Sequence, residues 1–434
     1  MKKIALYILS ITLCFTACRK DESVFDQSPD ERINKTLSDY QAALVSSPTG
    51  WKATIIPGNG GIYHFYFRFN SENRVVMYSD FDTATAKHQK ESSYRLKALQ
   101  QPTLIFDTYS YLHLLADPDA AVNGGSYGSG LLSDFEFALD TLYADSIILT
   151  GKMNNTRVRL EKASQQELDE WQNGEWADAL SFINIANIKN YFKRLTLDGV
   201  EYEVHIDPAS RTIVFQWLSG GAIKQFATAY YFKAGGIQFE NPLTNGSQTI
   251  TGFSDISWSD DTQTLSVNVN NTAGAIAGAV KPLKTDVNAP RRWWQKAADD
   301  DGYWVSLQGF HVNGVDDAYG VTSIPDYAFM IFWPKYGTNS GITYDLTGFI
   351  TADAEELALN FGAAYQTPAF TSDGRIMFTY LGTLGDVPPE AEDAYLATAG
   401  NFLNPAGFYL VQTSETSYDM VSADDAKTWI TWVY

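Results

Sequence analysis

The feature that most constrains the fold of this chain is a two-residue alternation of aromatic side chains. Rings recur at every second position of one short segment, at Tyr63, Phe65, Phe67 and Phe69. Successive side chains of a strand point to opposite faces, so this period is that of a β-strand. A second apolar run, 75–78, follows the turn-like segment 70–73. The two runs therefore predict an antiparallel β-hairpin.

Aromatic residues are abundant along the whole chain and favour strands. They make up 14% of the 434 residues, with 11 Trp, 25 Tyr and 25 Phe. Similar runs predict further strands at 93–99, 103–106, 133–139, 146–149, 200–206, 212–218, 225–232, 264–269 and 428–434. In three regions an aromatic strand precedes a polar turn and a second strand, which indicates either a tandem β repeat or chance similarity. We expect a mainly β fold of tandem antiparallel β domains, barrel-like or sandwich-like.

Two capping boxes mark the beginnings of helices. Ser28 and Glu31 begin an N-terminal helix, and Ser164 and Glu167 begin a helical connector that Gly174 interrupts. Single hydrophobic cores stop growing at about 250–300 residues, so two or three domains are expected. The predicted organisation is a signal peptide (1–17), a lipid-anchored tether (18–27), an N-terminal β-rich domain with a leading helix (28–162), the helical connector (163–195), a second β-rich domain (196–281), a linker (282–301) and a C-terminal β-rich domain (302–434).

The N-terminal segment has the pattern of a secretory signal. Lys2 and Lys3 precede the uncharged apolar run 4–15, which is too short to span a bilayer as a helix. The segment 15–18 resembles the lipobox of bacterial lipoproteins, although Phe15 replaces the usual aliphatic residue. The resemblance implies that Cys18 is acylated and anchors the protein to the outer membrane. The alternative is an ordinary signal peptide with an incidental cysteine.

The segment after Cys18, the cysteine count and the net charge indicate where the protein is exposed and which partners it excludes. The segment 19–22, Arg-Lys-Asp-Glu, resembles the surface-export tag of lipoproteins from Bacteroidetes-type bacteria, which implies exposure at the cell surface. Cys14 and Cys18 are the two cysteines of the chain, so the body has no disulfide and no thiolate metal site. The formal net charge of −20 argues against nucleic acid, which requires a basic face.

Several segments together resemble one group of proteins. They are 50–51, which also resembles the start of lipocalin-like barrels, and 65–80, 91–96, 102–109, 115–118 and 133–137. The group consists of Bacteroidetes lipoproteins classed as a domain of unknown function. The resemblance implies an accessory of starch-utilisation-type nutrient uptake, beside a TonB-dependent porin and its lid lipoprotein. It brings no catalytic residues.

No motif in the sequence carries a catalytic or metal-binding assignment. The five histidines, His64, His88, His113, His205 and His311, form no local metal motif, although a zinc site built from distant histidines stays open. Ser126 fits Gly-x-Ser-x-Gly, but no helix signal follows it. Asp299 begins an acidic run that lacks the closing Glu of a calcium-binding loop. Calcium binding by an irregular loop stays an open alternative. We expect no cofactor and assign no catalytic or metal-binding residue.

Exposed aromatic rings are the remaining candidates for ligand binding. The residues selected are Tyr109, Tyr111, His113, Trp293 and Trp294. Tyr109 and His113 lie at helical spacing and should share a face. The competing interpretation is that these rings pack between domains, because large exposed apolar patches are uncommon.

These observations favour a non-catalytic, surface-exposed lipoprotein that binds a glycan or peptide nutrient for a TonB-dependent uptake complex. One alternative is a surface hydrolase with a dispersed carboxylate or histidine site. Another is a structural or adhesive module. A deep cleft with two convergent carboxylates or clustered histidines would favour the hydrolase, and flat domains without a cavity would favour the adhesive module.

Overall fold

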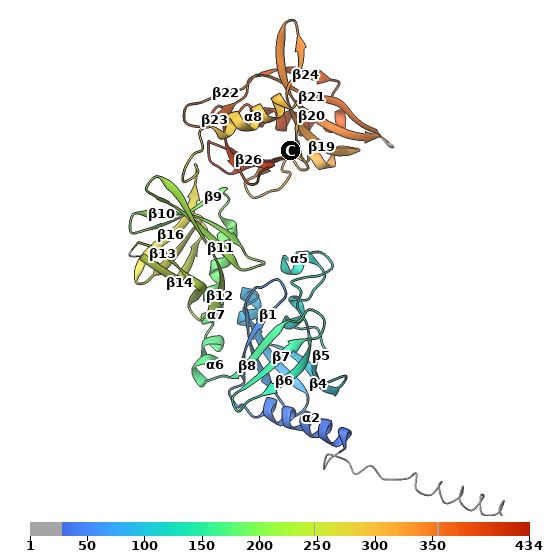
Figure 1. The fold of residues 1–434 in the computed structure, drawn as a ribbon, viewed down its shortest axis with the longest axis vertical. Helices are drawn as coiled ribbons and strands as arrows, with labels where there is room; N and C mark the ends of the chain where they lie inside the picture. Colours follow the sequence, from blue (N-terminus) through green and yellow to red (C-terminus); the bar gives the residue numbers. More distant parts are fainter. Residues whose placement is uncertain (1–27, 247, 354–355) are drawn as a thin grey trace, which may run out of the picture. The chain divides into compact units, whose positions relative to one another are not determined.

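The computed structural model describes residues 28–246, 248–353 and 356–434 (Figure 1). The predicted signal peptide and Cys18 lie outside these residues. The chain divides into two compact units. The first comprises Met1–Gly58, His64–Ser79 and His88–Asp169, and the second comprises Asn59–Tyr63, Asp80–Lys87 and Glu170–Tyr434. Each unit is described separately below.

The first unit begins with the predicted helix, α2 (Pro29–Val45). The capping box forms as expected, because Ser28 Oγ accepts from the Glu31 amide at 3.2 Å and Glu31 Oε2 accepts from the Ser28 amide at 2.8 Å. The helix contacts strands β4 (Lys90–Ala98) and β5 (Pro102–Phe106). The indole of Trp51 donates to the Leu44 carbonyl at 2.8 Å, which joins the end of the helix to the first strand.

The strands of the first unit form a closed antiparallel barrel in sequence order (Figure 1). They are β1 (Trp51–Ile56), β2 (Tyr63–Phe69), β3 (Arg74–Ser79), β4 (Lys90–Ala98), β5 (Pro102–Phe106), β6 (Glu136–Leu142), β7 (Ser146–Gly151) and β8 (Arg157–Lys162). β2 and β3 are the predicted hairpin, with Phe69 opposite Val75. Phe65, Phe67 and Phe69 are buried as the alternation requires. Short helices α4 (Tyr111–Leu114) and α5 (Ala120–Asn123) lie between β5 and β6 in the sequence, and α3 (Thr83–Lys87), between β3 and β4, belongs to the second unit.

The predicted helical connector forms three short helices. They are α6 (Gln165–Gln172), α7 (Glu175–Ala179) and the 3₁₀ helix η1 (Leu180–Asn187). Gly174 has a φ of +83° and interrupts the helix where the sequence indicated, because glycine adopts this left-handed conformation without a steric penalty. The buried ring of Phe182 contacts Tyr230 and Phe253 of the second barrel, at centroid distances of 5.3 and 6.0 Å.

The second unit contains another closed barrel. Its strands are β9 (Phe192–Leu197), β10 (Val200–Asp207), β11 (Thr212–Ser219), β12 (Ala222–Lys233), β13 (Gly236–Asn245), β14 (Gln248–Ser259), β15 (Thr264–Val269) and β16 (Thr272–Ala279). β9 pairs with β16 to close it. Aromatic side chains fill its interior, namely Tyr202, Phe215, Tyr230, Phe239 and Phe253.

A buried ion pair also belongs to the second unit. Arg211 is 2% exposed, and its Nη1 lies 2.9 Å from Oδ2 of Asp80, which is fully buried. Arg211 Nη2 donates to the Asp80 carbonyl at 2.6 Å, and the guanidinium lies 3.8 Å from the ring centroid of Tyr63. The charge of Arg211 is therefore compensated by a carboxylate, a carbonyl and an aromatic face.

The C-terminal region of the second unit is an 11-stranded sheet rather than a barrel. Its order is β22–β23–β25–β26–β27–β17–β19–β20–β21–β24, with β18 paired to β27. The strands are β17 (Trp304–Ser306), β18 (His311–Val312), β19 (Tyr327–Asn339), β20 (Ile342–Asp353), β21 (Glu356–Gln366), β22 (Ala369–Phe370), β23 (Arg375–Met377), β24 (Tyr380–Gly385), β25 (Phe408–Gln412), β26 (Ser417–Ser422) and β27 (Thr428–Val433). The helical elements here are α8 (Ala289–Asp299), η2 (Val321–Ser323), η3 (Pro389–Ala391) and α9 (Glu392–Phe402).

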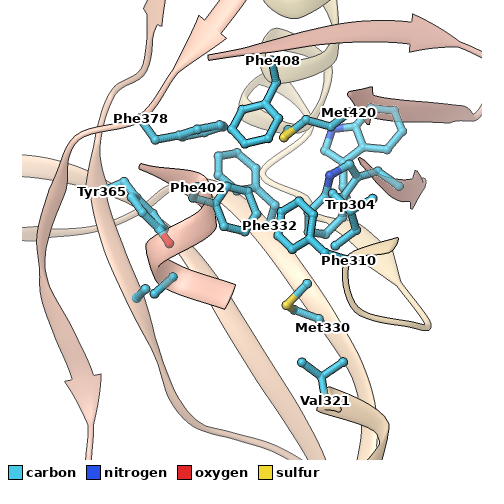
Figure 2. Packing of buried hydrophobic residues seen from close by; sticks show 14 of the residues in the cluster. Trp304, Phe310, Val321, Met330, Phe332, Tyr365, Phe378, Phe402, Phe408 and Met420 are labelled. Atoms are coloured by element: carbon cyan, nitrogen blue, oxygen red, sulfur yellow. The ribbon is translucent and has the colours of Figure 1, made fainter. Parts of the chain in front are cut away.

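Figure 2 shows the core of this region, where Phe402 of α9 lies among Phe332, Phe378 and Phe408. Helix α8 contributes to the same core, so the segment 282–301 is not the plain linker that we expected. The mainly β architecture with an N-terminal helix is confirmed. Within the described ranges, none of the helices combines the length and apolar character needed to cross a bilayer.

Candidate functional site

The second unit contains a cleft of about 700 Å³ to which two tryptophans contribute. We call it the aromatic cleft. Residues from four segments line it: the end of η1 and the start of β9, the β14–β15 hairpin, β18 with the turn after it, and β27. The lining residues are Ala186, Asn187, Ile188, Lys189, Lys193, Trp258, Asp260, Gln263, His311, Asn313, Gly314 and Trp429. These segments lie far apart in the sequence, so the cleft forms only in the tertiary structure.

Backbone and side-chain bonds hold the start of β9 against the C-terminal sheet. The Tyr191 amide donates to the Ala426 carbonyl at 2.7 Å, and Asn190 Nδ2 donates to the Asp425 carbonyl at 2.7 Å. The Tyr191 hydroxyl donates to Asp419 at 2.6 Å. Burial and the nearby carboxylate raise the pKa of Tyr191, so this hydroxyl keeps its proton. These bonds fix Lys193, two residues further along β9, relative to Trp429.

Trp429 stacks against His311 at this cleft. Their ring centroids lie 3.7 Å apart with an interplanar angle of 20°. Nδ1 of His311 lies 2.5 Å from Oδ1 of Asp316, and Nε2 accepts from the Gly314 amide at 3.1 Å. Because Nε2 acts as an acceptor, the proton lies on Nδ1 and points to the carboxylate. Both ring nitrogens are therefore occupied, and His311 supports the indole instead of offering a free base.

Trp258 is the second indole of the cleft. It lies near the end of β14 and is half-buried. Its Nε1 donates to Asp260 Oδ1 at 2.6 Å, which fixes the ring and occupies one carboxylate oxygen. Trp429 is half-buried as well. A half-buried indole has an apolar face that a ligand can cover, with a gain of buried apolar area.

The polar groups of the cleft are amides and two lysines. Lys193 is half-buried, and burial lowers the pKa of its ammonium group. Its Nζ donates to the Asn190 carbonyl at 3.3 Å. Within the part of the chain that the structure describes, neither Lys193 nor Lys189 forms an ion pair. Asn187, Asn313 and Gln263 supply both donors and acceptors.

A second hollow of about 350 Å³ shares His311 and Trp429 with the aromatic cleft. Its other lining residues are Val305, Ser306, Leu307, Gln308, Gly309, Asp316, Asp317, Ile430, Thr431 and Val433. The stacked pair thus contributes to two adjoining hollows. A chain-like ligand that passes Trp429 would meet polar side chains on both sides of the pair.

The predicted candidates Tyr109, Tyr111 and His113 lie in the first unit, at and before α4. Tyr109 stacks on His113 with centroids 5.5 Å apart, although Tyr109 precedes α4 and the two residues do not share a helix face. His113 in turn stacks on Phe135 at 4.8 Å, and no local pattern in the sequence indicates this third ring. Lys90 Nζ lies 5.5 Å from the ring centroid of Tyr109 and 5.6 Å from that of Tyr111.

This aromatic row is partly accessible. Tyr109 is 50% exposed and Phe135 is 40% exposed. Desolvation of the hydroxyl, together with its hydrogen bond to the Asp117 carboxylate, raises the pKa of Tyr109 to about 12, so the ring stays neutral. Desolvation lowers the pKa of His113. The row is a neutral aromatic surface, and a ligand-binding role for it stays a prediction.

Trp293 and Trp294, the other predicted candidates, are core residues. They are 0% and 7% exposed, so neither ring is free to stack on a ligand. Trp293 lies 4.7 Å from the ring of Phe332, and Trp294 Nε1 donates to Asp345 Oδ2 at 2.6 Å. The reason is local: Pro290, Trp293, Trp294 and Ala297 have the spacing of one helix face and are buried together. That spacing was a usable signal.

Asp345 accepts this hydrogen bond without any exposure to solvent, and burial raises its pKa to about 6 from an ordinary value of 3.8. Between these values the folded state binds more protons than the unfolded state. The free energy of unfolding is therefore expected to fall as pH rises from about 4 to about 6, by about 3 kcal/mol in all.

The variant Asp345→Asn should remove this fall in urea titrations across that pH range. Asp299→Asn, at an exposed residue of α8, is the control and should keep it. An unchanged pH profile in Asp345→Asn would show that another group is responsible.

Sequence reasoning missed Trp258, Trp429 and Lys193. Each lies in or beside an ordinary strand pattern, and no local signal distinguishes it. Two motifs were considered in the sequence, a nucleophilic serine and a calcium loop. Ser126 lies after α5 in a turn, where it bridges to Gly130, and Asp299, the first residue of the acidic run, ends α8. Across residues 28–246, 248–353 and 356–434, no three His, Cys, Asp or Glu side chains gather closely enough to hold a metal ion.

Comparison with solved structures found distant likenesses, of which two are described. The octameric penicillin-binding protein homologue from Pyrococcus abyssi is 11% identical, with a TM-score of 0.16, and the alignment covers 35% of this chain and 37% of that one. This chain thus spans little more than a third of that protein. The β clamp of Helicobacter pylori bound to a DNA ligase peptide is 10% identical, with a TM-score of 0.16 and coverage of 93% and 97%. Scores this low carry no argument about this chain.

A search of curated proteins found no match to this chain. In a comparison with family models, residues 21–259 match the model of DUF4302, which is described as a domain of unknown function. The match covers more than half of the 434 residues, including the whole of the first barrel and most of the second. The protein therefore belongs to the DUF4302 family.

Proposed function

We propose that this protein is a glycan-binding lipoprotein that captures a nutrient at the cell surface. The observation that carries the proposal is the aromatic cleft, where the half-buried indoles of Trp258 and Trp429 lie among amide side chains. Sugar rings have apolar C–H faces and polar edges. Indole faces cover the former, and amides bond the latter. The volume of about 700 Å³ is in the range of small-molecule sites.

A glycan fits this cleft better than an extended peptide does. Peptides that bind by strand addition need a free strand edge. β9 pairs with β10 and β16, β14 pairs with β13 and β15, and β27 pairs with β26, β17 and β18. Of the strands that line the cleft, β9, β14 and β27 are therefore already paired on both sides, and the two-residue β18 pairs with β27. Recognition there relies mainly on side chains.

The chemistry of the cleft supports binding rather than hydrolysis. Glycoside hydrolysis usually requires two carboxyl groups on either side of the scissile bond. Asp260 supplies the carboxylate among the described lining residues, and it is bonded to Trp258. His311 has both ring nitrogens occupied, so it is not placed to act as a general base. We therefore propose a non-catalytic role.

The proposed location rests on the N-terminal sequence. Removal of residues 1–17 and acylation of Cys18 would anchor the protein to the outer membrane, and the segment 19–22 supports exposure at the cell surface. The proposed partners are a TonB-dependent porin and its lid lipoprotein. Affinity purification of the acylated protein from its own membrane is expected to recover such a porin.

The glycan proposal predicts that each cleft indole contributes strongly to affinity. In Trp258→Ala and Trp429→Ala, the dissociation constant for a bound oligosaccharide should rise about tenfold, which corresponds to about 1.4 kcal/mol, because the ring face is lost. An oligosaccharide array identifies the ligand, and titration calorimetry on the full-length acylated protein in detergent measures the affinity.

The control for this experiment is Trp333→Ala. Trp333 is also half-buried, but it packs on Tyr303 and Tyr336 away from the cleft. Its replacement should leave affinity unchanged, and thermal unfolding establishes that all three variants are folded. The proposal would be overturned if the protein bound peptides and not sugars. It would also be overturned if the dissociation constant for the sugar were unchanged in both cleft variants.

A further inference from the structure

The two buried arginines of the second unit are paired with carboxylates, but Lys193 at the aromatic cleft is not. Arg211 lies 2.9 Å from Asp80, and Arg194, which is 9% exposed, lies 3.1 Å from Glu203. Lys193 lies on the same strand as Arg194, β9, and directly precedes it in the sequence. Although it is half-buried, its Nζ has the Asn190 carbonyl as its hydrogen-bond partner, and among the described residues no carboxylate pairs with it.

The absence of a partner is notable in so acidic a chain. The sequence has 51 Asp and Glu residues against 31 Lys and Arg residues. Burial of an ammonium group is unfavourable unless a negative charge compensates it. Burial alone accounts for the lowered pKa of Lys193, with no contribution from a nearby carboxylate. The cationic head is thus left without the compensation that the two buried arginines have.

The surroundings of Lys193 place this uncompensated charge beside the indoles. Lys189 and Lys193 both line the cleft with Trp258 and Trp429. Lys189 is exposed and forms no ion pair among the described residues. Asp260, the acidic residue of the lining, is bonded to the Trp258 indole at 2.6 Å. Two unpaired ammonium groups therefore accompany two aromatic faces in one cleft.

Such a combination is complementary to a sugar that carries a negative charge. The ring face would lie on an indole, and an anionic substituent at its edge would accept hydrogen bonds from the ammonium groups. Bonds of this kind, between oppositely charged groups, are stronger than bonds between neutral ones. A neutral glycan would cover the indoles but would leave the charge of Lys193 uncompensated.

We propose that the aromatic cleft binds an acidic oligosaccharide, with a uronate carboxylate placed on Lys193. This inference rests on the proposed glycan-binding function and specifies its ligand. Lys189 would strengthen the same interaction from the exposed side of the cleft. The amides of Asn187, Asn313 and Gln263 would bond the hydroxyl groups of the sugar.

The test compares charged and neutral forms of the same sugars. Oligogalacturonides, alginate oligosaccharides and hyaluronan oligosaccharides are titrated into the full-length acylated protein, each beside its methyl-esterified form. The ester removes the negative charge and keeps the ring faces. We expect at least one acid to bind more than tenfold more tightly than its ester.

Variants then assign the effect to Lys193. Lys193→Gln should weaken binding of the acid about tenfold and change binding of the ester less than twofold. Lys193→Arg keeps the charge and should retain most of the preference. Lys152→Gln, an exposed lysine of the first unit, is the control and should change neither affinity. Thermal unfolding of each variant establishes that it is folded.

The outcomes separate this inference from the proposed function. If acids and esters bind equally and Lys193→Gln changes neither, the acidic ligand is overturned and glycan binding stands. A preference for sulfated oligosaccharides over uronates overturns the carboxylate assignment. If no oligosaccharide of either form binds, both proposals are overturned.

Discussion

Replacing Cys18 by serine is expected to release essentially all of the protein from the membrane fraction. Acylation of the proposed kind requires a thiol, and a serine hydroxyl does not substitute for it. A single acyl chain binds a bilayer only weakly, so stable attachment requires several chains on the same residue. Since the predicted anchor depends on one sulfur atom, its loss should have an all-or-none effect.

The measurement is cell fractionation together with metabolic labelling by palmitate. Cys14→Ser is the matched control, because Cys14 is the other cysteine of the chain and lies within the predicted signal peptide. It should leave both labelling and membrane attachment intact. Protease added to intact cells should digest the wild-type body if it is exposed at the surface. Wild-type protein that carries no label on Cys18 would contradict the anchor.

Replacing Asp80 by alanine is expected to lower the free energy of unfolding of the second unit by about 3–5 kcal/mol, because it leaves the buried guanidinium of Arg211 without its carboxylate. Arg211 is 2% exposed and bonds both carboxylate oxygens of Asp80, at 2.9 and 3.1 Å. Water cannot replace these bonds without opening the structure. The expected loss is a large part of the stability of a typical domain.

Urea unfolding followed by tryptophan fluorescence measures this loss. The control is Asp39→Ala, which removes an ion pair of similar length, 2.7 Å, whose partners Lys35 and Asp39 are 63% and 51% exposed. Exposed pairs contribute about 0–1 kcal/mol, so this variant should change little. The double variant Asp80→Leu with Arg211→Met should recover much of the loss, because it leaves no unpaired charge. Equal effects of Asp80→Ala and Asp39→Ala would contradict the assigned role of burial.

Local signals in the sequence were reliable where local physics decides the structure. The alternation at 63–69 predicted β2, because in a strand it determines which side chains face the core. Ser28 with Glu31 predicted the start of α2, and the capping box forms within four residues. Gly174 predicted the break between α6 and α7, because few other residues adopt its backbone conformation.

The tryptophan pair shows where local interpretation failed. Trp293 and Trp294 stand beside two arginines and near prolines, so the sequence predicts a linker over 282–301 whose rings either bind a ligand or pack between domains. In the structure one face of α8 is buried in the C-terminal core and the arginines lie on the other. The apolar residues of this segment do have helical spacing. The aromatic cluster alone, however, did not indicate whether the rings would face solvent or a protein core.

The sequence by itself determined the type and faces of the main elements, since alternation, caps and glycine conformations act within a few residues. Only the tertiary structure decided that Trp51 of β1 pairs with Lys162 of β8 and that β9 closes on β16, because alternation specifies a buried face but not a partner strand. The same holds for the aromatic cleft. Lys193, Trp258 and Trp429 belong to different strands, and their proximity depends on long-range pairing that no single segment encodes.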